Sequence, residues 1–355
     1  MKADAKTQEY FSGRVKQVFV YITSRCQLRC KQCLYKPLLN NNSLDIDFIL
    51  LQNLLTQFYN YGARKLSFLG GEPTLYFDTK SKKTFGDVLQ MSKEIGYKLV
   101  RIDTNGQFDE NTLVNGWYGL LDEITFSVDG HNAMLNDAVR GKNTFSRCIK
   151  NITKAVQLGY NVQITSCVHR KSCPTPAIGM QNIHEMILFA QSLGVNTINF
   201  HPIIRSGIAR DNWIEDTDID PLTWVAIYNH IKDNIANGIY QIHVRIPMRF
   251  EQTSILEKDK DKYFYCPLHL GERALIMPDG QIKVCAFTIG TERCIARYTS
   301  EGIRFEQKDN EAFSLSEPPQ GVCYNQVGLE HLTPLCMSFK PNQDEFVWNL
   351  LKSLV

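Results

Sequence analysis

The sequence predicts an α/β fold, a partial (β/α)6 TIM-like barrel of parallel strands with a small C-terminal β-hairpin domain. Over the first 200 residues, short runs rich in Val, Ile, Phe and Leu alternate with amphipathic stretches, and the turns between them are short. Strands that alternate with helices pair in parallel through right-handed crossovers. Ligands of such a barrel gather at the carboxyl ends of its strands.

The expected strands end in polar residues or glycine, and they are Gln17–Thr23, Lys65–Leu69, Lys98–Asp103, Glu123–Val128, Asn161–Val168 and Thr197–His201. The expected helices carry apolar residues at helical spacing, and they are Asp45–Tyr61, Phe85–Ile95, Thr144–Leu158 and Asn182–Leu193. Ser43 is a candidate cap of the first helix, and Gly194 is a candidate stop of the last.

The pattern changes at about Asp211. A helix is expected over Asp220–Asn237, a strand over Gln241–Ile246, and a hairpin over Cys266–Phe287 with Pro278-Asp279-Gly280 as its turn. A closing helix is expected near Phe346–Leu354. These features divide the chain into a tail (1–15), a barrel (16–210), a connecting helix and strand (211–260) and a hairpin domain (261–355).

Composition excludes several classes of protein. A formal net charge of +2 over 355 residues gives no field that would attract nucleic acid or an acidic membrane. The amino terminus has no apolar signal core, and no run approaches the roughly 20 apolar residues of a membrane span. We therefore expect a cytoplasmic protein with reduced thiols. Its eleven cysteines then favour metal or cluster ligation over disulfides.

Three cysteines, Cys26, Cys30 and Cys33, follow the first expected strand. Iron–sulfur clusters prefer cysteine thiolates as ligands. Three thiolates at this spacing can hold three irons of a cubane and leave the fourth iron open to a substrate or cofactor. The alternative is a structural zinc site, which a fourth Cys or His would normally close. The following residues, Leu34–Ile49, contain neither.

The spacing C-x3-C-x2-C at the end of a first strand resembles the signature of the radical S-adenosylmethionine (SAM) superfamily. The resemblance implies a [4Fe–4S] cluster whose open iron chelates SAM, and reductive cleavage of SAM to a 5′-deoxyadenosyl radical. It also implies a reducing partner such as a flavodoxin or ferredoxin. The chain departs from the family at Gln32, because the residue before the third cysteine is usually aromatic.

Motifs at the ends of the next strands resemble the family's SAM-binding positions. Gly70-Gly71-Glu72-Pro73 is similar to the GGEP motif, in which backbone atoms and the Glu carboxylate orient the SAM amino group. Asn105 lies in a TNG-like sequence, although a simple Asn-Gly turn explains it almost as well.

The fourth strand ends in the SxDG sequence Ser127-Val128-Asp129-Gly130, and Arg140 follows. By resemblance, Ser127, Asp129 and Arg140 belong to the SAM site, where the Ser and the Arg contact the carboxylate or ribose. Ser166 is a weaker candidate for a ribose contact, since strand alternation equally predicts a buried structural serine.

Cys266, Gly280 and Cys285 are spaced as at the start of a SPASM or twitch domain, which carries auxiliary iron–sulfur clusters. By this resemblance, Cys323 and Cys336 complete the ligands of one auxiliary [4Fe–4S] cluster, with Cys294 as a substitute. The further cysteine run of a full SPASM domain is missing, so we expect a shortened domain. The alternative is that these cysteines are free thiols. If Cys294 is not a ligand, it is a candidate hydrogen-atom donor to a substrate radical.

The resemblance implies an enzyme that abstracts a hydrogen atom from a substrate held away from solvent. The leading hypothesis is the modification of a ribosomally synthesised peptide or protein, although no leader-binding domain is obvious at the amino terminus. A close alternative is a dehydrogenase, cyclase or epimerase of a small molecule such as an amino acid, amino sugar or alcohol. A third is a non-catalytic zinc-binding adaptor. Polar residues at the barrel mouth are candidate substrate contacts or, equally, loop residues with solvated tips, and they are His169, Arg170, His201 and Arg205.

Overall fold

The computed structural model contains all six predicted strands in one sheet. They are β2 (Gln17–Tyr21), β3 (Lys65–Leu69), β6 (Leu99–Thr104), β7 (Glu123–Ser127), β8 (Asn161–Val168) and β9 (Thr197–Pro202). Each strand is parallel to the next in this order, which confirms the predicted α/β class with a mostly parallel sheet. The structure describes residues 2–35, 39, 44–203, 219, 221–245, 249–252, 271–290, 292, 294–306 and 332–335.

The sheet continues past both ends of these six strands. A parallel strand, β10 (His243–Arg245), is added beside β9, and another, β12 (Arg273–Ile276), beside β2. Antiparallel strands β13 (Gln281–Lys283), β14 (Ala296–Thr299) and β15 (Gly302–Phe305) follow β12, and β1 (Lys2–Ala3) lies parallel to β15. The full order is β1-β15-β14-β13-β12-β2-β3-β6-β7-β8-β9-β10.

The predicted hairpin is formed by β12 and β13, which turn where the sequence predicts. Gly280 has a φ of +89° in this turn, a conformation that favours glycine. The sequence places the hairpin in a domain of its own, whereas in the structure its first strand pairs with β2 and both share one sheet. The physical reason is that Ala274 and Ile276 continue the buried apolar surface of the barrel strands.

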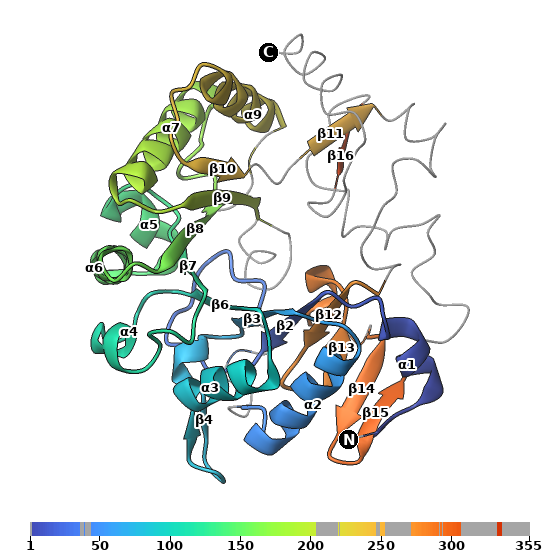
Figure 1. The fold of residues 1–355 in the computed structure, drawn as a ribbon. Coiled ribbons are helices and arrows are strands. Elements are labelled where there is room, and N and C mark those ends of the chain that lie inside the picture. The colour runs from blue at the N-terminus through green and yellow to red at the C-terminus, as the bar shows by residue number, and fades with distance from the viewer. Residues whose placement is uncertain are drawn as a thin grey trace.

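The main helices lie along one face of the curved sheet, which we call the outer face (Figure 1). They are α2 (Phe48–Asn60), α3 (Phe85–Ile95), α4 (Asn111–Asn115), α5 (Ala133–Arg140), α6 (Thr144–Gln157), α7 (Pro176–Ser192) and α9 (Pro221–Ala236). The other described elements are α1 (Ala5–Phe11), the 3-10 turns η2 (Pro73–Leu75) and η4 (Ala286–Thr288), and two short antiparallel pairs, β4 (Phe77–Asp78) with β5 (Lys83–Thr84) and β11 (Arg249–Gln252) with β16 (Leu332–Leu335). Among these helices, none is long and apolar enough to cross a membrane.

Two helices begin at positions that differ from the prediction. The first turn of α2 starts at Phe48, because the carboxylate of Asp47 accepts hydrogen bonds from two of its backbone N–H groups, at 3.0 and 3.1 Å. The predicted cap Ser43 lies outside the described residues. Helix α7 starts earlier than predicted, since Thr175 caps it and Pro176 suits a first helical turn.

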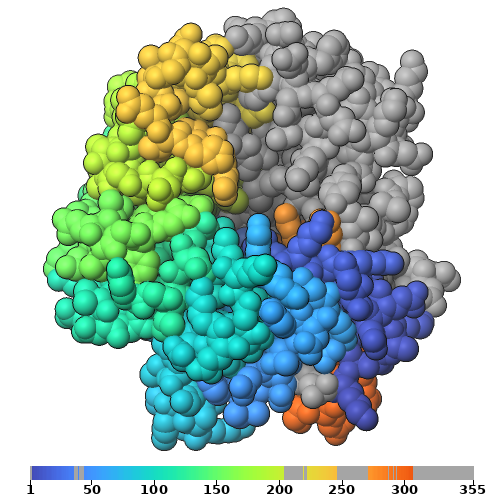
Figure 2. Space-filling view, viewed as in Figure 1, coloured from blue at the N-terminus to red at the C-terminus, as the bar shows by residue number. Residues whose placement is uncertain are grey.

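Residues 1–15, predicted as a tail, are folded against the sheet from residue 2 onward. Strand β1 pairs with β15, and Asp4 caps α1 by accepting a hydrogen bond from the Thr7 N–H at 2.8 Å. Phe11 and Val15 are buried in the main core. Figure 2 shows this blue N-terminal segment next to the orange segments that contain β14 and β15. The predicted closing helix near Phe346–Leu354 lies outside the described residues.

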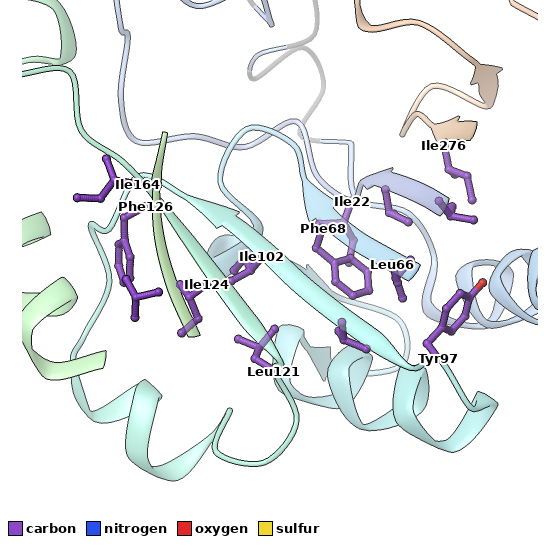
Figure 3. Close-up of a cluster of buried hydrophobic side chains, with 14 of the residues drawn as sticks. Ile22, Leu66, Phe68, Tyr97, Ile102, Leu121, Ile124, Phe126, Ile164 and Ile276 are labelled. Atoms are coloured by element: carbon purple, nitrogen blue, oxygen red, sulfur yellow. The ribbon is translucent and has the colours of Figure 1, made fainter. Parts of the chain in front are cut away.

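The two faces of the sheet differ in chemistry because successive side chains of a strand point to opposite sides. On the outer face, apolar side chains are fully buried between strands and helices, among them Leu66, Phe68, Ile102, Ile124 and Phe126 (Figure 3). The opposite face, which we call the inner face, carries polar side chains, among them Ser67, Arg101, Asp103, Glu123 and His201. This division identifies the inner face as the place for a polar ligand.

Candidate functional site

The three motif cysteines lie on the loop that leaves β2, which we call the cluster loop (residues 22–35). Cys26, Cys30 and Cys33 are all half-buried, and burial raises the pKa of each thiol, to about 11 for Cys26 and about 12 for Cys33. The metal-free thiols are therefore protonated at neutral pH, and a bound metal must displace their protons.

The cluster loop is attached to the end of α5 by its backbone. The Lys31 N–H donates to the Val139 carbonyl at 2.8 Å, and the Cys30 thiol lies 3.8 Å from the carbonyl oxygen of Arg140. Within the described residues, no three His, Cys, Asp or Glu side chains are close enough to hold one metal ion. A four-iron cluster has separate irons, so its ligands stand further apart than those of a single ion.

The second motif continues the pairing of β3 with the cluster loop. The Gly71 N–H donates to the Thr23 carbonyl and the Glu72 N–H to the Arg25 carbonyl, both at 2.8 Å. A Cβ at Gly71 would lie 2.1 Å from the Arg25 oxygen, and one at Gly70 would lie 2.6 Å from the Thr23 oxygen. Glycine is therefore required at both positions, because the two backbones approach too closely for any side chain.

Glu72 connects this motif to the turn after β6. The side chain is buried, and burial raises its pKa. Its carboxylate accepts hydrogen bonds from the Thr104 hydroxyl at 2.8 Å, the Asn105 N–H at 2.8 Å and the Thr74 N–H at 3.3 Å. The Asn105 side-chain nitrogen lies 3.8 Å from the sulfur of Cys26. Pro73 is buried at the start of η2. The structure thus places Glu72 and Asn105 beside the first cysteine.

Asp129 and Arg140 form a buried ion pair at the end of β7, with the Arg140 Nε 2.7 Å from the Asp129 Oδ2. The same Oδ2 accepts a hydrogen bond from the side-chain amide of Gln32, and Oδ1 accepts one from the Cys167 N–H at 2.7 Å. Asp129 therefore joins the cluster loop, α5 and β8. Its backbone carbonyl also lies 3.0 Å from the His169 ring.

The Arg140 side chain provides the clearest test of whether this site fits a cofactor. Arg140 is 9% exposed, and its Nε is buried in ion-pair contact with Asp129 but makes no hydrogen bond of good geometry with the described residues. Its two terminal nitrogens make no hydrogen bond with any described residue. A buried guanidinium is costly to leave unpaired, and its planar fork suits a carboxylate. Together with three thiols on the adjoining loop, the donor set fits a cluster and a ligand that carries a carboxylate.

The two predicted serines lie on opposite faces of the sheet. Ser127 ends β7 on the inner face, half-buried, and its hydroxyl makes no hydrogen bond with the described residues. Ser166 is buried on the outer face with Ile164 and Val168. The structure therefore brings Ser127 to the site but not Ser166. Strand alternation in the sequence is the signal that separates them.

A network of charged side chains on the inner face was missed by sequence reasoning. Arg101 donates to both carboxylate oxygens of Asp103, at 2.8 and 2.9 Å, and to Glu123 at 3.3 Å. His201, a predicted substrate contact, feels the charges of Asp103 and Arg101. Burial lowers its pKa to about 4, so its ring is neutral at pH 7. The alternation of β6, with buried Val100 and Ile102, was the available signal.

The other predicted substrate contacts have different surroundings. His169 is fully buried, and its ring accepts the Ser172 N–H at 3.3 Å, so it holds the loop after β8 in place. Arg170 is exposed. Arg205 lies outside the described residues, as do the predicted auxiliary ligands Cys266, Cys323 and Cys336.

The two described C-terminal cysteines lie in different surroundings. Cys285 is half-buried at the start of η4. Burial raises the pKa of Tyr21, and the charges of Asp103 and Cys285 raise it further, which places Cys285 near the carboxyl end of β2. The Cys294 thiol donates to the Glu306 carboxylate at 3.6 Å, within a partly exposed ion cluster that includes Arg297.

An apolar cluster connects the hairpin to the cluster loop. The rings of Tyr21 and Tyr35 stack with centroids 5.1 Å apart. Leu275, Met277 and Ile289 complete the buried part of this cluster, with Cys33 packed against it. The C-terminal hairpin therefore covers one side of the loop that carries the cysteines.

Comparisons with known proteins agree with this geometry. Residues 20–171 match the model of the radical SAM superfamily. The chain is 27% identical to GTP 3′,8-cyclase of Vibrio parahaemolyticus over 281 residues, which are 76% of this chain and 75% of the relative. It is 26% identical to the same enzyme of Psychromonas ingrahamii over 282 residues, which are 76% of this chain and 71% of the relative.

Two solved structures share the fold. Streptococcus suis SuiB, solved with its precursor peptide SuiA, aligns with a TM-score of 0.62 and 18% identity over 83% of this chain. The alignment covers 65% of SuiB, so this chain spans just under two thirds of that protein. The structure of anSMEcpe with bound AdoMet aligns with a TM-score of 0.57 and 15% identity, over 76% of this chain and 74% of that one.

Replacing Gly71 by alanine should loosen the cluster loop, because the added Cβ would overlap the Arg25 carbonyl oxygen. Neither atom can rotate away, since each is attached directly to the backbone. In the metal-free protein, we expect Gly71→Ala to raise the rate of alkylation of Cys26, Cys30 and Cys33 about tenfold. Gly86→Ala is the matched control, since its Cβ meets nothing closer than 3.6 Å. Equal alkylation rates in Gly71→Ala and the parent chain would contradict this role for the close approach.

Proposed function

We propose that this chain, whose residues 20–171 match the radical SAM superfamily, is an enzyme that cleaves SAM reductively and abstracts a hydrogen atom from its substrate. In this proposal Cys26, Cys30 and Cys33 bind a [4Fe–4S] cluster. The cluster and SAM together supply the radical chemistry, and the protein supplies position and insulation. The proposal rests on the two terminal guanidinium nitrogens of Arg140. They have no hydrogen-bond partner among the described residues and lie beside the loop that carries the three thiols.

The chain's own residues would hold the cofactor at three points. Arg140 offers two terminal nitrogens to a carboxylate, while its Nε stays paired with Asp129. The carboxylate of Glu72 lies within electrostatic reach of Cys26, and its charge favours a cationic amino group there. The Ser127 hydroxyl on the inner face can donate to, or accept from, a hydroxyl group of the cofactor.

The surroundings of the cluster loop would exclude water from the reaction. The apolar cluster of Tyr21, Tyr35 and Met277 closes one side of the loop, and all three side chains are buried. A carbon radical reacts with most groups it meets, so its target must be held close and dry. The inner face below the loop is the space that remains for a substrate.

A peptide or protein is our first candidate for the substrate. The fold resembles that of SuiB, which was solved with a precursor peptide. The donors of Arg101 are taken up by Asp103 and Glu123, so this arginine is not available to a phosphate. The network carries one more carboxylate than guanidinium, and the lowered pKa of His201 leaves its ring neutral. A triphosphate would find no attraction at this part of the inner face.

A nucleotide or other small molecule is the second candidate, because the curated relatives are GTP 3′,8-cyclases over about three quarters of this chain. The two candidates therefore differ in whether GTP is consumed.

We also propose that Cys285 binds an auxiliary cluster together with Cys266, Cys323 and Cys336. Cys285 lies where the hairpin approaches the cluster loop, which supports a site near the barrel. Cys294 remains a substitute ligand. Its contact with a partly exposed glutamate does not favour the hydrogen-atom donor role, which needs a shielded thiol.

Changing Cys26, Cys30 and Cys33 together to alanine should abolish formation of 5′-deoxyadenosine from SAM, because no ligand of the proposed cluster remains. The measurement is product analysis after anaerobic reconstitution with iron, sulfide and a chemical reductant. Cys173→Ala is the control, since that cysteine is buried against Ser172 away from the site. Product formation by the triple variant would refute the assignment, and a zinc-loaded, iron-free parent chain would favour the adaptor hypothesis.

If the substrate is a peptide, GTP should not be consumed. We expect anaerobic incubation with SAM, reductant and GTP to leave the GTP concentration unchanged and the rate of 5′-deoxyadenosine formation within about twofold of the rate without GTP. The V. parahaemolyticus cyclase serves as the positive control. Loss of GTP in step with 5′-deoxyadenosine would overturn the first candidate in favour of the second.

Cys285→Ala should lower the iron content by about one cluster, roughly four irons per chain, while cleavage of SAM by the barrel cluster persists. Iron and sulfide are measured on reconstituted protein, with Cys173→Ala as a control for the loss of a thiol buried in the main hydrophobic core. An unchanged iron load in Cys285→Ala would leave the C-terminal cysteines as free thiols.

A further inference from the structure

Gln32 stands where the family usually has an aromatic side chain, and the structure gives it a specific contact. It lies between Cys30 and Cys33 on the cluster loop and is only 8% exposed. Its side-chain amide donates to the Oδ2 of Asp129, the oxygen that also pairs with Arg140. The residue that departs from the family pattern is therefore joined to the buried ion pair.

The Gln32 contact limits how Arg140 can pair with Asp129. Arginine and carboxylate often pair through two parallel hydrogen bonds that use both carboxylate oxygens. Here the Oδ1 of Asp129 is occupied by the Cys167 N–H, and Oδ2 is shared with Gln32. Arg140 consequently approaches through Nε alone, at 2.7 Å, and its terminal nitrogens stay free of described partners.

We propose that Gln32 is a positioning residue for the SAM site, acting through Asp129 to keep the terminal nitrogens of Arg140 available to the cofactor's carboxylate. The inference rests on the proposed function and adds a specificity role for one residue of this chain. Gln32 itself need not touch the cofactor.

The other half of the Gln32 amide argues against a purely structural role. Its carbonyl oxygen, Oε1, is buried and has no hydrogen-bond partner among the described residues. A buried unpaired carbonyl destabilises a folded protein, whereas an apolar side chain at this position would leave no unpaired oxygen. Stability alone would therefore favour an apolar residue, and the retained amide points to a task for its N–H group.

The test compares Gln32→Leu and Gln32→Glu with the parent chain. Leucine has nearly the size of the glutamine side chain but removes the donor to Asp129. Glutamate has the shape of glutamine, but its carboxylate cannot donate and places a second negative charge beside Asp129. We expect the Kd and KM for SAM to rise about tenfold in Gln32→Leu and at least as much in Gln32→Glu, the usual cost of one charge-assisted hydrogen bond. The kcat at saturating SAM and the iron content should change less than about twofold.

One further measurement and a control variant distinguish the positioning role of Gln32 from a purely structural role. The melting temperature of the metal-free Gln32→Leu protein should stay close to that of the parent, because the loss of the donor to Asp129 and the removal of an unpaired oxygen act in opposite directions. Gln90→Leu is the matched control, since Gln90 also donates to a carboxylate, that of Glu94 at 2.9 Å, on the distant helix α3.

The outcomes are distinguishable. SAM binding within twofold of the parent in both Gln32 variants, with a full iron load, would overturn the inference. Loss of iron in Gln32→Leu would also overturn it, because Gln32 would then hold the cluster rather than Arg140. A parent chain that holds iron but binds no SAM would instead refute the proposed function.

Discussion

The buried ion pair of Asp129 and Arg140 is the interaction on which the site depends. It lies at the end of β7, and its neighbours come from the cluster loop, α5 and β8. Leaving one charge of a buried pair unpartnered costs about 3–5 kcal/mol, so the three segments are held in one arrangement. The two terminal nitrogens of Arg140 make no hydrogen bond with the described residues, and a bound carboxylate would give them a partner. A structural anchor and a binding group are thus combined in one residue.

The second constraint is the close approach of two backbones at the ends of β2 and β3. Gly70 and Gly71 allow the chain after β3 to run directly against the cluster loop, and Glu72 then reaches the turn after β6. Together these contacts gather the carboxyl ends of β2, β3, β6 and β7 around the three cysteines. The fold therefore fixes the cysteine loop through its neighbours on both sides, whereas the chemistry of the thiols requires only that they stay reduced and within reach of one cluster.

The strands were predictable because each carries a short run rich in Val, Ile, Phe or Leu, and all six end within two residues of the predicted end, with Lys65–Leu69 matching at both ends. The motif residues were predictable because their spacing is specific. The pairing of β12 with β2 was not, since it joins residues far apart in sequence and leaves no local signal. The contact of Gln32 with Asp129 was missed for the same reason, whereas the alternation of β6 was an available signal for the Arg101 network. For Ser166, the structure agrees with the alternative that strand alternation predicted, a buried serine beside Ile164 and Val168.

The central claim is that one iron of the cluster has no protein ligand and lies beside the terminal nitrogens of Arg140. Electron paramagnetic resonance tests this claim most directly. The spectrum of the reduced, reconstituted chain should change when SAM is added, and SAM labelled with 17O in its carboxylate should broaden or split the signal. Asp129→Ala should weaken this effect with the iron load retained, because Arg140 loses its partner. A spectrum that SAM leaves unchanged, or one that shows a fourth protein ligand on the cluster, would contradict the account.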